Sequence, residues 1–382
     1  MNAHRYYHKR LALADMAAQR VSIVPLQEDM LAEATGGAAL GSLLLKSLPD
    51  AFMLCAGPLT GSFAPSSGLA VAVFSLGGEL CRVPVLQGIG AMLRQCGVDA
   101  LALAGRAEVP LTLRLTKGAG RLDPAKTPRC PDYTRAAQRE ELLRTTQDGT
   151  AALLLAGADS TGLRGAGMHL GSAPQAAALA EALHERNCAA LVFEGGSAMP
   201  PVPLPADTPL RVRLAPKAYF AQELAACGVQ LPADMRWKSA ACYHCPAPCQ
   251  AWVKLSSGGY VFCADHRAFA ALADACGAAA PDALAGCDIF GLDPQLTAPL
   301  LKGASAADLP ALLKKALEEH DAPDGAKPAV REEYTDSMRA GMVLGICPHL
   351  LRRNPSVTPE DLCGLLDTDL QRRLPAAWEL MP

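Results

Sequence analysis

Residues 51–74 read Ala51-Phe-Met-Leu-Cys-Ala-Gly57-Pro-Leu-Thr-Gly-Ser-Phe-Ala-Pro-Ser-Ser-Gly68-Leu-Ala-Val-Ala-Val-Phe74. The short apolar runs at 51–56 and 71–74 predict two strands. The loop between them is dense in glycine, proline and small hydroxyl residues. One interpretation is an ordinary wide turn. In the other, glycines let backbone N–H groups approach a ligand, and hydroxyls donate to a phosphate.

The segments around this unit divide the chain into two parts. Up to residue 195 we expect strands and helices in alternation, with strands at 21–25, 51–56, 71–74, 100–103, 151–156 and 189–193, a hairpin at 109–121, and helices at 27–33, 88–96, 133–147 and 174–186. A proline-rich linker occupies 197–209. Beyond it we expect helices at 217–227, 264–279, 306–320, 331–343 and 359–366. The pattern predicts an α+β protein with a β-rich domain at 1–198 and a mainly helical domain at 210–382.

Composition narrows the class of protein. Of 382 residues, 50% are hydrophobic and 19% charged, which favours a folded chain. The net charge of −3 provides no basic field, so nucleic acid is not expected as a partner. No run of about 18 apolar residues predicts a membrane span. The N-terminal residues lack the apolar stretch of a signal peptide, so we expect a cytoplasmic protein.

Fourteen cysteines without a secretion signal favour reduced thiols and metal ligation over disulfides. Several lie in apolar surroundings and are expected to be small core residues, namely Cys55, Cys81, Cys96, Cys188, Cys227 and Cys276. Only Cys242-Tyr-His-Cys245-Pro-Ala-Pro-Cys249 has ligand spacing, C-x2-C-x3-C. Its prolines disfavour a helix and predict a stiff loop. A fourth ligand must come from elsewhere, and the spacing alone leaves zinc and an iron–sulfur cluster open.

Several segments, taken in their order, resemble the tungsten-pterin aldehyde:ferredoxin oxidoreductase family. In the first half, residues 57–68 look like the family's G-P-L-T-G-x-x-A-P-x-S-G, and Gly97-Val-Asp99 with residues 105–110 is similar to its G-Y-D and G-R-A-E-x-P. Residues 164–172 look like a shortened R-G-G-x-G-x-x-x-G-S, and residues 187–195 match N-L-K-A-I-x-x-x-G without the lysine. In the second half, the similar segments are the cysteine loop 242–249, residues 288–293, which match D-x-x-G-L-D, and Leu344-Gly-Ile-Cys347. The match spans most of the chain.

The resemblance implies a fold and a metal centre. Family members have a β-rich N-terminal base for a pair of pterins and largely helical domains beside a four-iron four-sulfur (4Fe–4S) cluster. By this resemblance Cys347 is the fourth cluster ligand, together with Cys242, Cys245 and Cys249. Four thiolates are the usual holders of such a cluster. The same four sulfurs suit a structural zinc, so that alternative stays open.

The resemblance also implies contacts to the pterins. Arg164, in a glycine-rich loop with Gly165 and Gly167, would bind the pterin phosphates. Asp288 and Asp293 would accept hydrogen bonds from pterin N–H groups. Asp293 precedes Pro294, however, and an Asp-Pro pair is a good helix start. A capping role is therefore the alternative for this acid.

Some positions depart from the family pattern. The family's carboxylate segment near the metal aligns best with Asp265-His-Arg-Ala268, so Asp265 is the candidate acid/base residue, one methylene shorter than glutamate. Met342 stands where an acid is expected. Only about fifty residues separate Asp293 from Cys347, far fewer than in the family.

The resemblance predicts oxidation of small aldehydes to acids at a tungsten or molybdenum bis-pterin site. Electrons would leave through the 4Fe–4S cluster to a ferredoxin-like carrier. The departures favour impaired or changed activity. One alternative is a non-catalytic electron-transfer or assembly protein that retains the cluster, and another is a zinc-stapled structural protein. Family members often pair subunits, which leaves a homodimer open.

Overall fold

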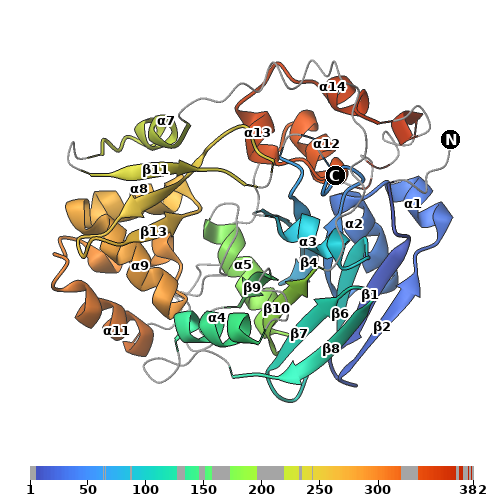
Figure 1. Cartoon of the computed structure of the whole chain (residues 1–382), viewed down its shortest axis with the longest axis horizontal. Coiled ribbons are helices and arrows are strands. Elements are labelled where there is room, and N and C mark those ends of the chain that lie inside the picture. The colour runs from blue at the N-terminus through green and yellow to red at the C-terminus, as the bar shows by residue number, and fades with distance from the viewer. Residues whose placement is uncertain are drawn as a thin grey trace.

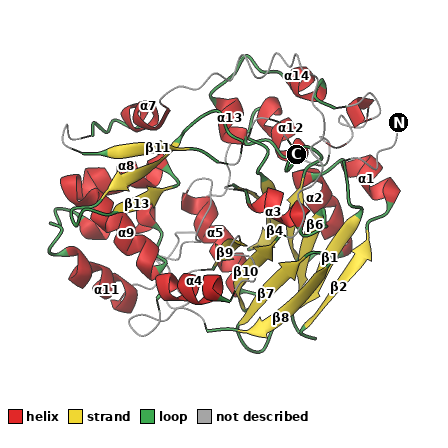
Figure 2. Cartoon of the chain, in the orientation of Figure 1, coloured by secondary structure: helices red, strands yellow, loops and turns green. Residues whose placement is uncertain are grey.

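The structure is a computed structural model (Figure 1). It describes residues 6–126 except 63, 65 and 87, then 134–145, 151–156, 173–195, 219–231, 235–319 except 243, 334–366, 370–372, 377 and 380. The predicted glycine-rich loop at 162–172 and the predicted linker at 197–209 lie outside these residues. Strands dominate the first half, and helices gather in the second (Figure 2).

The first sheet has six strands in the order β2-β1-β6-β3-β4-β5. Their bounds are β1 (Arg10–Asp15), β2 (Arg20–Pro25), β3 (Phe52–Ala56), β4 (Ala70–Leu76), β5 (Glu79–Val85) and β6 (Ala100–Ala104). The fully buried β3 pairs antiparallel with β4, with Cys55 opposite Val71, so the loop 57–68 leaves one edge of this sheet. The predicted strands at 51–56 and 71–74 are confirmed, while β1 and β5 were not predicted.

A second sheet of four strands, in the order β8-β7-β10-β9, packs beside the first, where β8 contacts β2. The strands are β7 (Leu111–Thr116), β8 (Ala119–Pro124), β9 (Ala151–Leu155) and β10 (Cys188–Glu194). The helices described in this half are α1 (Glu28–Ala34), α2 (Gly37–Ser47), α3 (Ile89–Gln95), α4 (Arg135–Arg144) and α5 (Ala173–His184). Apolar side chains of both sheets, α3 and α5 form one continuous core.

The described part of residues 210–382 packs into two separate hydrophobic cores. The unit around the first core comprises α7 (Tyr219–Ala226), β11 (Trp237–Ala240), β12 (Gln250–Lys254), β13 (Tyr260–Cys263), α8 (His266–Cys276), η2 (Gly277–Ala279), α9 (Ala280–Phe290), α10 (Pro294–Thr297), η3 (Ala298–Leu301) and α11 (Leu309–Glu319). The unit around the second core comprises α12 (Asp336–Leu344), α13 (Pro348–Arg352) and α14 (Pro359–Cys363). It returns to the first half, where α12 packs on α2 (Figure 1).

The helical stretch His266–Phe290 is long and apolar enough, by length and composition, to cross a membrane. It is the one such stretch among the residues described. It comprises α8, η2 and α9, and 56% of its most apolar window is buried inside the protein. Gly277 interrupts it with a φ of +55°. Phe269, Leu272 and Ala283 pack into the core of the helical unit, so the stretch is apolar because it is a core element.

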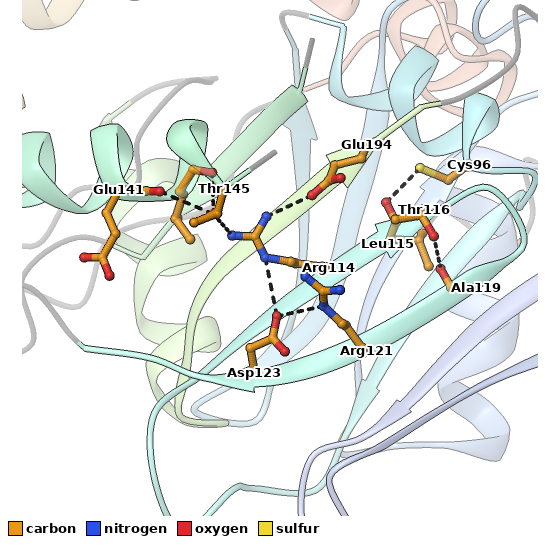
Figure 3. A network of polar contacts seen from close by, with 11 residues as sticks. Cys96, Arg114, Leu115, Thr116, Ala119, Arg121, Asp123, Glu141, Thr145 and Glu194 are labelled. Atoms are coloured by element: carbon orange, nitrogen blue, oxygen red, sulfur yellow. Dashed lines mark hydrogen bonds and ion pairs between the residues drawn. The ribbon is translucent and has the colours of Figure 1, made fainter. Parts of the chain in front are cut away.

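A buried polar network fastens α4 to the second sheet (Figure 3). The Arg114 guanidinium on β7 donates to the Glu194 carboxylate at 2.8 Å and to the Thr145 hydroxyl at the end of α4. Asp123 on β8 lies 3.4 Å from Arg114 and also accepts from Arg121. Each polar group thus keeps a partner, as burial requires. The helix predicted at 133–147 is confirmed as α4, which is half-buried.

Two arginines of α4 join the two halves of the protein. Arg135 donates to the Asp288 carboxylate on α9 at 2.8 Å and to the Asp288 carbonyl at 2.9 Å. Arg139 donates to the other carboxylate oxygen at 3.0 Å. Arg135 is buried, so Asp288 offsets a charge that has left water. This arrangement places Asp288 at the interface between the two halves.

Replacing Asp288 with asparagine is expected to lower the free energy of unfolding by about 1–2 kcal/mol, because Arg135 stays buried while its carboxylate partner loses charge. Half-exposure of Asp288 and Arg139 keeps the effect below that of a fully buried pair. Urea unfolding followed by circular dichroism measures the change. Asp274→Asn removes the same charge from an exposed position on α8 and should change stability little. Equal effects of the two substitutions would contradict this role.

Candidate functional site

The three-cysteine loop is the connection of a β-hairpin. Strands β11 and β12 pair antiparallel, with Ala240 opposite Gln250, and thereby bring both ends of the loop together. Within the loop, Cys245 N–H donates to the Cys242 carbonyl at 2.9 Å, and Cys249 N–H donates to the Ala247 carbonyl at 2.9 Å. These turns make a compact loop that carries three thiols. The sheet that holds the loop was not predicted from the sequence.

Ser66, in the glycine-rich loop 57–68, bridges the cysteine loop to Cys347. Its N–H donates to the His244 carbonyl at 2.9 Å, and its carbonyl accepts from the Cys347 N–H at 3.3 Å. A second contact joins the same two loops, since the His244 Nδ1 lies 2.9 Å from the Ser62 carbonyl oxygen. Segments from three distant parts of the sequence therefore meet at one residue.

Close backbone packing explains the glycines on both sides of this junction. Leu59 N–H donates to the Leu344 carbonyl at 2.9 Å. A Cβ on Gly57 would lie 2.1 Å from the Leu344 carbonyl carbon, and one on Gly345 would lie 2.1 Å from the Thr60 hydroxyl oxygen. Gly345 also ends α12 with a φ of +92°. At these positions glycine is required for packing.

The hydroxyls of the loop 57–68 hold the loop itself. Thr60 Oγ1 accepts from the Gly57 N–H and donates to the Leu69 carbonyl, both at 2.9 Å. Ser67 donates to the Ser62 carbonyl at 2.6 Å. Thr60 and Ser67 are buried. For these residues the structure supports the turn interpretation of the loop.

The four predicted cluster cysteines pack into one region of the core. Cys347 is buried, and the three loop thiols are partly buried against the same cluster of apolar residues. Burial, together with the nearby Cys245 and Cys249, raises the pKa of the Cys347 thiol to about 12. Burial also raises the pKa values of Cys245 and Cys249. The sulfurs thus lie within electrostatic range of one another.

The other cysteines occupy different surroundings. Cys55, Cys81, Cys96, Cys188 and Cys276 are buried as expected, but Cys227 is exposed, because α7 ends there at the protein surface. Cys263 is buried at the end of β13, near Cys249. Cys263 is therefore the described thiol that best rivals Cys347 as a fourth ligand.

Two carboxylates lie near each other in the helical unit. Asp265 caps α8 by accepting from the Arg267 N–H at 2.8 Å. Asp293 caps α10, where its Oδ1 accepts from the N–H groups of Gln295 and Leu296 at 2.9 and 3.1 Å. Burial raises the pKa of Asp293 to about 7, and the charge of Asp265 adds to that shift. The capping interpretation of Asp293 is confirmed.

Comparison with known proteins identifies the first half of the chain. Residues 11–195 match the family described as "Aldehyde ferredoxin oxidoreductase, N-terminal domain". The chain carries an aldehyde ferredoxin oxidoreductase N-terminal domain. This range contains both sheets and the loop 57–68. The predicted α+β architecture, with a β-rich domain of this family followed by a more helical region, is confirmed.

A solved structure is similar to most of the chain. It is the active-site complex BamBC of benzoyl coenzyme A reductase in complex with 1,5-dienoyl-CoA, at a TM-score of 0.61 and 13% identity. The match covers 82% of this chain and 59% of that chain, so this chain spans less than two thirds of its structural relative. At this identity the likeness shows the fold. A search of curated protein sequences found no match.

The thiol set of this chain fits an iron–sulfur cluster in its chemistry. Four thiols come from two loops that Ser66 links, and cluster iron takes thiolate ligands. Among the residues that the structure describes, no three His, Cys, Asp or Glu side chains converge closely enough to hold one metal ion. Cys242, Cys245, Cys249 and Cys347 would each supply one thiolate to the iron of a cluster. The assignment of Cys242, Cys245, Cys249 and Cys347 stays a prediction.

The family's pterin contacts fit in part. Asp293 Oδ2 is buried, and no described residue hydrogen-bonds to it, which suits an acceptor for a ligand N–H group. Asp288 differs, because Arg135 and Arg139 already pair with both of its carboxylate oxygens. Arg164, Gly165 and Gly167 lie outside the described residues. Asp293 is therefore the predicted pterin contact with the clearest structural support.

One functional candidate was missed in the sequence. Arg353 follows α13, where its Nε donates to Glu223 on α7 and its Nη1 donates to the His349 carbonyl at 3.3 Å. Glu223 also pairs with His266 of α8 at 3.2 Å. Burial lowers the pKa of His266 to about 4. The three side chains come from three separate elements, so no sequence spacing could have indicated the group.

Proposed function

We propose that this chain is an iron–sulfur oxidoreductase of the aldehyde ferredoxin oxidoreductase type, with a 4Fe–4S cluster bound by Cys242, Cys245, Cys249 and Cys347. The observation that carries the proposal is the hydrogen-bonded bridge at Ser66, which joins the cysteine loop to Cys347. Burial of the thiols supports it, since a site shielded from water protects a cluster. Ser66 lies within the family-matched half.

The proposed reaction converts a small aldehyde and water into a carboxylic acid, two protons and two electrons. Electrons leave one at a time to a ferredoxin-like carrier. When bound, a tungsten or molybdenum bis-pterin supplies the two-electron site. Asp293 would accept a pterin N–H at Oδ2, and Asp265, which lies nearby, would hold or release a proton. Because Asp265 also caps α8, we expect slow turnover.

A second candidate is a non-catalytic electron-transfer or assembly protein that keeps the cluster. Two of the predicted site acids support this candidate, because both already make structural contacts. Asp288 pairs with two arginines, and Asp265 caps the N-terminus of α8. Metal content separates the two candidates, since only the oxidoreductase needs a group-six metal.

Anaerobic purification from an iron-supplemented host, followed by metal analysis, tests the proposal. We expect about four irons and four sulfides per chain and a brown sample. Tungsten or molybdenum together with iron would favour the oxidoreductase, and iron alone would favour the carrier. A colourless protein with one zinc per chain would overturn both candidates.

Replacing Cys347 with serine is expected to abolish stable cluster binding, because a hydroxyl is a poor substitute for a thiolate on iron. Iron and sulfide analysis and the visible spectrum measure the loss. Cys363→Ser, on α14 in the same C-terminal unit, is the matched control and should keep its iron. Full iron content in the Cys347 variant would assign the fourth ligand elsewhere, with Cys263 next.

A further inference from the structure

Arg353 ends α13, the helix that begins at the predicted cluster ligand Cys347. Its side chain is largely buried, and its positive charge lowers the pKa of the Cys249 thiol. Its charge also acts on Cys245 and Cys347, so it faces cysteines from both the hairpin loop and the C-terminal unit.

Contacts on its other side fix the orientation of Arg353. Its Nε is bound by Glu223, and its Nη1 is bound by the His349 carbonyl one turn earlier. Glu223 is fixed in turn by His266 at 3.2 Å. Because Nε and Nη1 are both bound and the guanidinium is planar, its remaining N–H groups point in a defined direction. The elements α7, α8 and α13 thus hold one charge beside the thiols.

We propose that Arg353 is a positioning residue that raises the reduction potential of the cluster bound by Cys242, Cys245, Cys249 and Cys347. The inference rests on the proposed function, since it requires that cluster. Reduction adds one negative charge to the cluster. A permanent cation beside its ligands stabilises the reduced form, and a hydrogen bond to a ligand sulfur acts in the same direction. Arginine keeps its charge at every working pH.

Glu223 balances this effect. Its carboxylate holds Arg353 in place, but its own negative charge opposes reduction. The geometry therefore predicts opposite signs for two substitutions. Removing the Arg353 charge should make the cluster harder to reduce, and removing the Glu223 charge should make it easier to reduce. A purely structural role would give no such opposition.

Redox titration of the purified, iron-loaded protein, followed by the electron paramagnetic resonance signal of the reduced cluster, tests the proposal. For Arg353→Gln we expect at least a tenfold shift of the one-electron equilibrium toward the oxidised form, which is 59 mV. Glu223→Gln should shift it in the opposite direction. Arg352→Gln removes the same charge from the neighbouring residue and should shift the potential much less. Arg353→Lys keeps the charge without the fork, and its potential should fall between those of the wild type and Arg353→Gln.

The results of these titrations distinguish a failure of the proposed function from a failure of this inference. A wild-type protein without iron would overturn the proposed function and, with it, this inference. A wild-type cluster combined with an unchanged potential in Arg353→Gln would overturn the inference alone. If Arg353→Gln loses its iron, Arg353→Lys carries the test, because it retains the cation. Loss of iron in both variants would show that Arg353 is structural and would overturn its role in setting the potential.

Discussion

Replacing Asp99 with asparagine is expected to lower the free energy of unfolding by about 3–5 kcal/mol, because the substitution leaves a buried arginine without its counter-charge. Arg94 and Asp99 form an ion pair whose side chains are both 0% exposed. Arg94 also donates to the Tyr6 carbonyl. Asp99 accepts from the backbone N–H groups of His8 and Arg10 at 3.1 and 3.3 Å. The pair therefore ties the N-terminal segment to the start of β6.

Urea unfolding at neutral pH measures this change. Asp50→Asn is the matched control, because Asp50 is exposed in the same half of the protein and should change stability by less than about 0.5 kcal/mol. We expect the Asp99 variant to lose the order of residues 6–10 first, which amide hydrogen exchange would report. Wild-type stability in the Asp99 variant would show that Arg94 finds another partner.

Replacing Asp293 with asparagine is expected to flatten the dependence of stability on pH. Burial raises the pKa of Asp293 from 3.8 to about 7 in the folded protein. The folded state therefore binds more protons than the unfolded state between about pH 4 and 7. Stability from this group is fully present below pH 4 and is lost as the pH rises to 7. The loss amounts to about 4 kcal/mol for a shift of this size.

Asparagine cannot ionise, yet its side-chain oxygen can still accept from the N–H groups of Gln295 and Leu296. At pH 8 the variant should therefore be more stable than the wild type, and at pH 4 the two should be similar. Thermal or urea unfolding from pH 4 to 8 measures both curves. Asp274→Asn, at an exposed site on α8, should leave the wild-type slope unchanged. Parallel curves for the Asp293 variant and the wild type would contradict the assignment of the titrating group.

Local sequence patterns predicted much of the first half. The runs at 51–56, 71–74, 100–103 and 189–193 are continuous and apolar because they form buried strands, and all are strands in the structure. The pattern did not reveal β11 to β13. These strands have only four or five residues, β11 has no fully buried residue, and a regular alternation of exposure and burial is present in β13 alone among the three. In so short a segment, pairing with neighbouring strands decides the structure more than intrinsic preference.

For the predicted site residues, too, local patterns indicated some features and missed others. The spacing of Cys242, Cys245 and Cys249 was enough to indicate a ligand loop. Its position beside Cys347 depends on the return of α12 to the first half and on the hydrogen bonds of Ser66. For Asp288 the motif and the fold disagree. The motif predicted a contact with a ligand, whereas in the structure the carboxylate binds two arginines of α4. A motif reports residue types, and the partners come from elsewhere in the chain.

Local patterns in the sequence were enough to predict the family of the N-terminal domain, the main strands of the two sheets and the cysteine loop, because buried strands and ligand spacing are local features. The need for glycine at positions 57 and 345, the two separate cores of the helical part and the nearness of Arg353 to the cysteines became visible in the folded chain alone. Contacts between residues far apart in the chain depend on how whole elements pack. Their energies arise from burial and charge at the meeting point, which no local pattern records.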